Sequence, residues 1–171
     1  MTIGAAPVGG VYFTWGGGFA KLLHDKMGIP GNVETTGGPV HNTQLLEAKQ
    51  LDFGMVTAAP VYEGWHGLGW AKGEKHQNPK MIFPMYASYL HAYALKKSGI
   101  KSIHEIETTH EVNIFGVPKA DAEKFIAKYP FFSTGIIPKG MYKANRDFDI
   151  ETVAVWNFMA VHKDAPGDFV I

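Results

Sequence analysis

Residues 1–61 read MTIGAAPVGGVYFTWGGGFAKLLHDKMGIPGNVETTGGPVHNTQLLEAKQLDFGMVTAAPV, and this stretch decides the fold. Three times an extended run passes through small residues or Gly and Pro into a helical pattern, at residues 6–11, 36–40 and 57–61. Strands, turns and helices that alternate in this way are typical of a sheet covered by helices. We therefore predict an α/β fold with an open, mostly parallel sheet flanked by helices.

The same patterns predict individual elements along the chain. In the first predicted helix, Trp15, Phe19 and Leu22 recur at helical spacing, which favours a place for Trp15 in the core. The segments at 67–79 and 130–145 are rich in Gly, Pro and polar residues and are predicted to be irregular. The predicted helices cover residues 11–27, 40–46, 61–65 and 120–128, with a further short one from Ile103. The predicted strands cover residues 2–6, 32–36, 52–57, 81–88, 91–96, 112–117 and 152–162, the last of them buried on both faces.

Composition excludes several classes of function. Apolar residues make up 46% of the 171 residues and charged residues 19%, which is typical of a folded globular domain. The 16 basic and 16 acidic residues cancel, so no broad positive field favours nucleic acid as a partner. All basic residues except Arg146 are lysines, so a bidentate clamp on a carboxylate must use Arg146 or come from elsewhere.

The absence of cysteine excludes disulfides and thiolate metal sites. The chain starts without a basic and apolar leader. Both observations are compatible with a periplasmic or other extracytoplasmic location if the signal peptide of the chain has been removed.

The three strand-to-helix junctions form the predicted binding site. In a parallel sheet such junctions gather at the carboxyl edge, where helix amides point at a shared crevice that suits an anionic or polar group. Glycines let a ligand approach the backbone, and Thr35, Thr36, Asn42 and Tyr62 offer polar side chains. The alternative is that each glycine only makes a tight turn or a cap. Among the nearby aromatic residues, Tyr12 and Tyr62 are the better candidates for the wall of the pocket.

Catalytic and metal chemistry find little support in the sequence. No histidines have the spacing of a zinc motif, so neither a metal site nor a cofactor is predicted. His91 and His162 lie in strand-like runs and are expected to be hydrogen-bonded core residues, whereas His41 lies beside a helix start. No G-x-S-x-G motif and no acid and base pair is apparent, so we predict that the chain is not an enzyme.

Three ordered motifs carry a resemblance to a known family. They are GAAPVGGVYF at residues 4–13, ETTGGPVHN at 34–42 and LDFGMV at 51–56. They closely resemble the opening lobe of the TAXI solute-binding proteins of TRAP transporters. The segments KYPFF at 128–132, IPKGMY at 137–142 and VAVWN at 153–157 look like the return of the chain into that lobe.

The resemblance implies a lobe of a type II periplasmic-binding-protein-like fold that captures a small organic solute, a carboxylate or an amino acid, for ion-driven uptake. It also implies membrane permease subunits of a TRAP transporter as partners. The ligand-binding residues predicted from the junctions and the resemblance are Val8, Gly9, Gly10, Tyr12, Thr36, Gly37, Gly38, Asn42, Ala59, Tyr62 and Tyr142.

The chain departs from the family pattern in its second half. In the family, the segment resembling residues 99–106 leads into a second lobe, but here a strand-like run follows almost at once. We therefore expect a single lobe over residues 1–171, with a junction near 107–111 where the second lobe is missing. Two alternatives stay open from the sequence, a ligand-sensing lobe of a signalling system and a small α/β enzyme that uses the same crevice.

Overall fold

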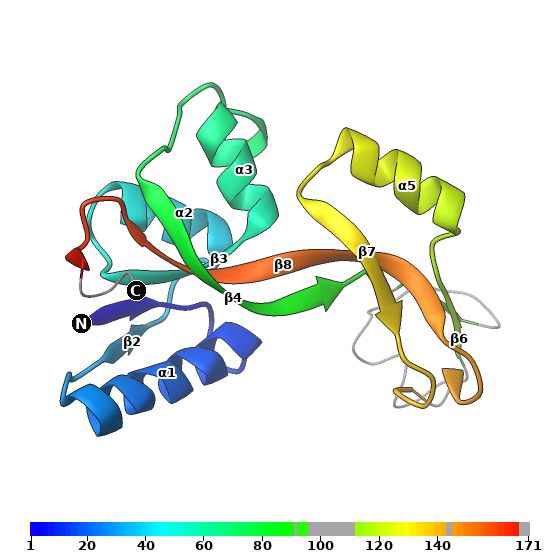
Figure 1. The fold of residues 1–171 in the computed structure, drawn as a ribbon, viewed down its shortest axis with the longest axis horizontal. Helices are drawn as coiled ribbons and strands as arrows, with labels where there is room; N and C mark the ends of the chain where they lie inside the picture. Colours follow the sequence, from blue (N-terminus) through cyan, green and yellow to red (C-terminus); the bar gives the residue numbers. More distant parts are fainter. Residues whose placement is uncertain (91, 96–111, 143–144, 168–171) are drawn as a thin grey trace. The chain divides into compact units, whose positions relative to one another are not determined.

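The computed structural model describes residues 1–90, 92–95, 112–142 and 145–167, which fall into two compact units (Figure 1). Unit 1 comprises Met1–Tyr86 and Trp156–Ile171, and unit 2 comprises Ala87–Val155. The predicted junction at 107–111, the helix predicted from Ile103 and His91 lie outside the described residues. The sequence predicted a single lobe over residues 1–171, whereas the structure groups the chain into these two units.

Unit 1 is built on an open sheet whose strand order is β2-β1-β3-β8-β4. β1 pairs in parallel with both β2 and β3, and β8 joins β3 antiparallel. The α/β class and the open sheet flanked by helices are confirmed. The sheet is mixed, not mostly parallel as predicted, because only β2, β1 and β3 pair in parallel, whereas β8 pairs antiparallel with both β3 and β7 (Phe132–Ile137). The strands are β1 (Thr2–Gly4), β2 (Asn32–Glu34), β3 (Phe53–Thr57), β4 (Pro79–Tyr89) and β8 (Ile150–His162).

Each parallel strand of unit 1 leads into a helix. α1 (Val11–Met27) follows β1, α2 (Pro39–Glu47) follows β2, and α3 (Ala58–His66) follows β3. A short 3-10 helix, η1 (Gly69–Ala71), lies in the segment that was predicted to be irregular. In Figure 1, α1 lies on one side of these strands, and α2 and α3 lie on the other.

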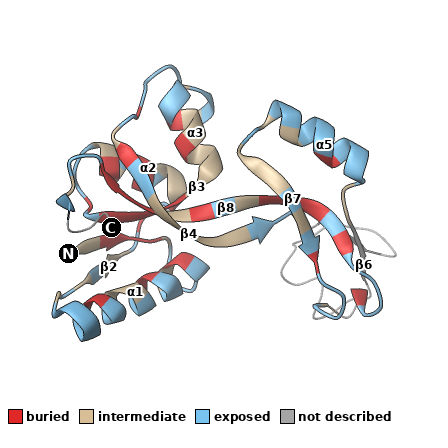
Figure 2. Ribbon diagram, viewed as in Figure 1, coloured by how far each residue is buried: buried red, intermediate tan, exposed pale blue. Residues whose placement is uncertain are grey.

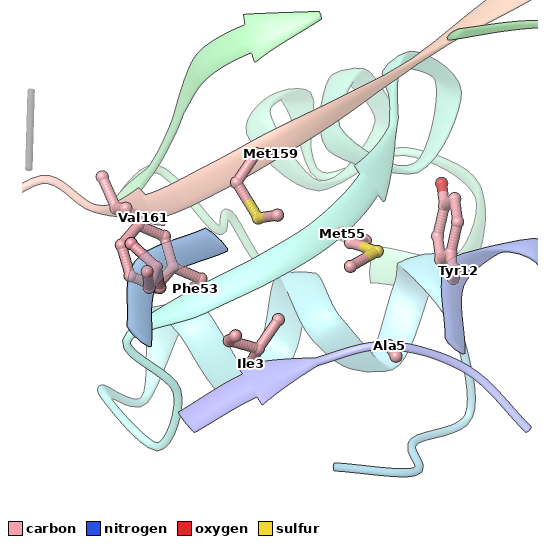
Figure 3. Packing of buried hydrophobic residues seen from close by; sticks show 8 residues of the cluster. Ile3, Ala5, Tyr12, Phe53, Met55, Met159 and Val161 are labelled. Atoms are coloured by element: carbon pink, nitrogen blue, oxygen red, sulfur yellow. The ribbon is translucent and has the colours of Figure 1, made fainter. Parts of the chain in front are cut away.

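Alternating side chains of β3 and β8 supply a core on each face of the sheet. Met55 and Met159 face the α1 side, where they join Ile3 and Tyr12, as Figure 3 shows. Val56 and Ala160 belong to the second cluster, together with residues of α2 and α3. This alternation explains why residues 158–161 are all apolar, and the prediction of a strand buried on both faces is confirmed there, whereas Trp156 of the same run is 42% exposed.

The prediction that Trp15 belongs to the core is wrong. Trp15 is 37% exposed and Leu22 is 52% exposed. The face of α1 that packs on the sheet instead carries Tyr12, Gly16 and Leu23. α1 has apolar residues on two faces, and the glycine at the centre of one face allows that face to approach the strands closely.

Unit 2 contains two strand pairings and one helix. β5 (Ala92–Leu95) pairs antiparallel with β6 (Val112–Phe115), and α5 (Lys119–Lys128) follows. β7 (Phe132–Ile137) pairs antiparallel with β8, so the prediction of an irregular stretch over 130–145 is wrong there. Gly135 disfavoured a strand prediction here, because glycine weakens strands. In the structure the aromatic ring of Tyr89 lies against Gly135 and fills the space that a side chain would take.

Burial differs along the described chain. Figure 2 shows buried residues concentrated on β3 and β8, whereas α5 is mostly exposed. Among the described helices, none is both long enough and apolar enough to cross a membrane.

Candidate functional site at the carboxyl edge of the parallel strands

The three predicted junctions meet at one edge of the unit 1 sheet. β1, β2 and β3 are parallel neighbours, so α1, α2 and α3 all begin at the carboxyl ends of these strands. β1 continues to a helix on one face, and its neighbour β3 continues to a helix on the other face (Figure 1). A crevice at such a switch point between adjacent strands is where open α/β sheets bind ligands.

The starts of the three helices carry little that would compete with a ligand. The residues at the capping positions are Gly10, Gly38 and Thr57, and none of them makes a side-chain capping bond. None of the three helices has an acidic residue in its first turn. Residues 5–20, 35–46 and 53–62 contain no Asp, Glu, Lys or Arg. The partial positive charge of three helix amino termini is therefore not offset by side chains of these segments.

The glycine amides at these turns are mostly used within the protein. The N–H of Gly10 donates to the Pro7 carbonyl at 3.1 Å. The N–H of Gly37 donates to Nδ1 of His41 at 3.0 Å, and that of Gly38 donates to Oγ1 of Thr36 at 3.1 Å. The donors that remain for a ligand are the first amides of the helices, because they have no acceptor within their own helix. Val11, Val40 and Ala59 carry three of these amides.

Tyr12 connects the start of α1 to the start of α3 through its hydroxyl group. The hydroxyl donates to Oδ1 of Asn157 at 2.5 Å and lies 2.9 Å from Oγ1 of Thr57. The Asn157 amide donates in turn to the carbonyl of Tyr86 at 3.0 Å. Burial raises the pKa of Tyr12 well above its ordinary value, so the phenol stays neutral. Tyr12 is buried, at 7% exposure.

Two further predicted site residues, Thr36 and Asn42, are buried beneath the edge. Asn42 has no exposed surface, and Thr36 is 8% exposed. The Asn42 amide donates to carbonyls of β3 and of the end of β1, while Thr36 contacts the Ala5 carbonyl. In this structure both side chains are occupied by the protein, and a direct contact with ligand stays a prediction.

The other predicted site residues lie at the surface or outside unit 1. Val8 and Gly9 are exposed in the turn before α1, and Ala59 and Tyr62 are half-buried on α3. The ring of Tyr62 lies 4.5 Å from that of His66 on the same helix. Unit 1 thus brings together every predicted site residue except Tyr142.

Tyr142 and Arg146 belong to unit 2. The N–H of Tyr142 donates to Oδ1 of Asn145 at 2.9 Å, and Arg146 is exposed. Ligand contact by Tyr142 stays a prediction.

Sequence reasoning did not single out Thr57 and Asn157 as side chains of this site. Asn157 is the one polar residue within residues 153–161 of β8 and is 3% exposed. A buried amide needs hydrogen-bond partners, so its position within an apolar run was an available signal. Its partners could not be read from the sequence, because Tyr12 lies 145 residues away.

Three surface hollows of the described chain lie away from the junctions. One is lined by Lys49, Asp52, His162 and Asp164 of unit 1, and two lie in unit 2 beside Glu151. His162 is buried, and its Nδ1 accepts the N–H of Asp164 at 3.0 Å, which confirms the prediction of a hydrogen-bonded core histidine. No cluster of metal-ligating side chains occurs among the residues that the structure describes.

Solved structures and curated sequences give limited similarity. A periplasmic substrate-binding protein of an ABC transporter from Coxiella burnetii is 13% identical, with a TM-score of 0.49, over 96% of this chain and 85% of that chain. An inferred lipoprotein from Actinomyces odontolyticus is 14% identical, with a TM-score of 0.44, over 99% of this chain and 85% of that chain. A comparison with curated protein sequences gave no match.

A match to a protein-family model shows the family of this chain. The model of the NMT1-like family matches residues 3–110 and residues 101–171. The two matched segments together span nearly the whole chain and include all three junctions. The chain therefore belongs to the NMT1-like family, a family of periplasmic solute-binding-protein-like chains.

Proposed function

We propose that this protein is an extracytoplasmic receptor that captures a small anionic organic solute, a carboxylate or an amino acid, at the carboxyl edge of β1, β2 and β3. The observation that carries the proposal is the meeting of three helix amino termini at one edge, each without a capping side chain or an acidic first turn. Each helix amino terminus favours negative charge, and its first amides are oriented donors.

A carboxylate fits this edge better than a cation or a purely apolar molecule. Two oxygens of one carboxylate can accept hydrogen bonds from amides of different helices, such as those of Val11 and Ala59. The three segments supply no carboxylate that would hold a cation. Recognition would thus rest on backbone amides and on the helix dipoles, with no need for Arg146.

The wider biological role is part of the same proposal. Membership of the NMT1-like family supports solute binding, and the three motifs at residues 4–13, 34–42 and 51–56 resemble those of TAXI proteins. We infer delivery of the solute to membrane permease subunits of a TRAP transporter and a periplasmic location. Neither catalysis nor a cofactor is part of this role.

A thermal-shift panel tests the proposal. Acetate, succinate and L-glutamate are compared with acetamide, succinamide and L-glutamine amide, none of which keeps a carboxylate, at the same concentration and ionic strength. At least one carboxylate is expected to raise the melting temperature in a saturable way, because only the folded state binds it. Equal shifts for the acids and their amides would contradict the proposal, and so would the absence of any saturable shift.

Gly38→Ala tests the start of α2 in this panel, and Gly17→Ala is its matched control. Gly38 has φ +88° and ψ −158°, a region that is essentially limited to glycine, so alanine there is expected to cost about 1–3 kcal/mol and to displace the start of α2. Gly17→Ala adds the same methyl group on the open side of α1, where nothing lies within 4 Å. The carboxylate shift is expected to shrink in Gly38→Ala and to persist in Gly17→Ala.

A further inference from the structure

Asn42 lies at the point where β1 and β3 stop pairing. The ladder between these strands ends with Gly4 opposite Gly54. Immediately beyond this pair, Nδ2 of Asn42 donates to the carbonyl of Ala5 at 2.7 Å and to the carbonyl of Met55 at 2.7 Å. One side-chain amide therefore bridges the two strands where the backbone bonds between them end.

Two glycines allow α2 to come close enough for this bridge. A Cβ atom on Gly54 would lie 2.8 Å from Cδ1 of Leu46 and 3.5 Å from Cβ of Asn42. A Cβ atom on Gly4 would lie 2.9 Å from Oδ1 of Asn42. Larger residues at either position would push α2 away from the sheet, and the Asn42 amide would no longer reach the strand carbonyls.

Thr36 extends the bridge to the start of α2. Its hydroxyl lies 2.6 Å from Oδ1 of Asn42 and 3.0 Å from the Ala5 carbonyl, either of which can accept its proton. Oγ1 of Thr36 also accepts a hydrogen bond from the N–H of Gly38 at 3.1 Å. Gly38 directly precedes the first turn of α2, so a continuous set of hydrogen bonds runs from β1 and β3 to that turn.

We propose that Asn42 and Thr36 are positioning residues that hold the first turn of α2 against the split between β1 and β3, and that they act on the solute through Gly38 and the amides that follow it. The inference rests on the proposed function, because it deepens the account of the same site. It assigns Asn42 a role under the binding surface instead of on it.

The burial of these groups supports this role over a purely local one. Both side chains are almost entirely buried. In the protein interior a hydrogen bond is stronger than in water, and an unpaired polar group is costly. Their partners lie on β1, on β3 and in the loop before α2. A network that spans three elements fixes their relative positions, whereas a bond within one helix does not.

Three substitutions separate positioning from ordinary stabilisation. Thr36→Val removes the hydroxyl group and keeps the branched shape, and Thr36→Ser keeps the hydroxyl group. Thr43→Val is the matched control, because Thr43 is fully buried on α2 and its hydroxyl donates to the Pro39 carbonyl of the same helix at 2.8 Å. Should Thr36→Val fail to fold, Thr36→Ala takes its place.

Two measurements are made on each folded variant. The first is the amide hydrogen exchange rate of Gly38 without ligand. The second is the Kd for the carboxylate of the thermal-shift panel that binds the wild type best. Thr36→Val is expected to speed Gly38 exchange and to weaken binding, each about tenfold, the effect of losing one buried hydrogen bond. Thr36→Ser is expected to stay within about twofold of the wild type, as a retained hydroxyl group predicts.

The outcomes distinguish this inference from the proposed function. Unchanged Gly38 exchange in Thr36→Val overturns the inference, and so does a loss of affinity in Thr43→Val as large as that in Thr36→Val. If no carboxylate binds the wild type, the proposed function fails, while the Gly38 exchange rates still decide whether Thr36 positions the start of α2.

Discussion

Tyr12 shows at the residue scale how a surface edge can depend on a buried polar group. Its hydroxyl group joins Thr57 at the start of α3 and Asn157 on β8. Its ring packs in the core on the α1 side, with its edge toward Tyr86 at a centroid distance of 6.2 Å. The aromatic body thus contributes to stability, and the hydroxyl group fixes the distance between two helix starts.

Tyr12→Phe is expected to lower the free energy of unfolding by about 1–3 kcal/mol, because the Asn157 oxygen loses its shortest hydrogen bond within the core. Urea denaturation measures this change. Tyr89→Phe is the control, because Tyr89 is 40% exposed, and its effect is expected to stay within about 0.5 kcal/mol. Equal stability of the two variants would contradict the account of this network.

Lys49 and Asp164 form an exposed ion pair with a distance of 2.9 Å. The hydrogen bond from Lys49 is the main cause that holds the pKa of Asp164 below its ordinary value. A carboxyl group whose pKa is lower in the folded state stabilises the fold above its unfolded pKa, and this contribution is lost as the pH falls through the folded pKa.

Lys49→Gln is therefore expected to raise the pKa of Asp164 toward its ordinary value, as followed by NMR titration of the carboxyl carbon. Because the pair is exposed, added salt is expected to reduce the difference between the variant and the wild type. A pKa of Asp164 that is the same in both proteins would show that the pair does not form in solution.

Individual side chains were the least predictable part of the candidate site. The turn residues were accessible to sequence reasoning, because Gly and Pro after an extended run have few other uses. The sequence did not distinguish a polar residue that faces a crevice from one that lies beneath it, as Asn42 does. That distinction depends on how closely α2 approaches β1 and β3, which is set by glycines on other elements.

At the element scale, α1 illustrates what periodicity can and cannot provide. Its limits, Val11–Met27, were predicted from the first apolar residue and the terminating Gly28. Gly28 has φ +67°, the left-handed conformation that commonly ends helices. The face that packs on the sheet was predicted only in part, because Phe19 packs against Phe53 while Trp15 and Leu22 are exposed. Apolar residues lie on two faces of α1, and only the tertiary packing selects between them.

The glycines of α1 provide a paired test of that packing. A Cβ atom on Gly16 would lie 3.0 Å from Cε of Met55 and 3.0 Å from Cγ1 of Val33, whereas one on Gly17 would have nothing within 4 Å. Gly17→Ala is expected to stabilise the protein by about 0.5–1 kcal/mol through helix propensity.

Gly16→Ala gains the same propensity but must displace buried neighbours, so it is expected to be less stable than Gly17→Ala. Thermal unfolding of both variants measures the difference. A greater gain in Gly16→Ala would mean that α1 packs on the sheet through another face.

β7 was missed because short strands can carry loop-like residues. Gly135 lies inside the strand, and Pro130 and Pro138 flank it. Strand pairing with β8 over six residues outweighs these local signals. In contrast, β8 could be recognised from the sequence, because a long, mostly apolar run is typical of a strand buried on both faces.

At the scale of the whole molecule, the chain builds unit 1 from two separate segments. Residues 156–162 of β8 return to lie between β3 and β4, and they complete a sheet that the first 86 residues begin. The order of motifs along the chain indicated such a return, but composition and periodicity do not show which strand a late segment will join. The class of fold was thus predictable, and the division of the described residues into two units was not.

The central claim is that unit 1 binds a carboxylate with the first amides of α1, α2 and α3. The most direct test is a titration of the isotopically labelled protein with the best carboxylate of the thermal-shift panel, followed by backbone amide NMR. Saturable shifts are predicted at Val11, Val40 and Ala59, which lie far apart in the sequence but at one edge of the sheet. Shifts confined to residues around Lys49 and His162, or no saturable shift at any amide, would contradict the claim.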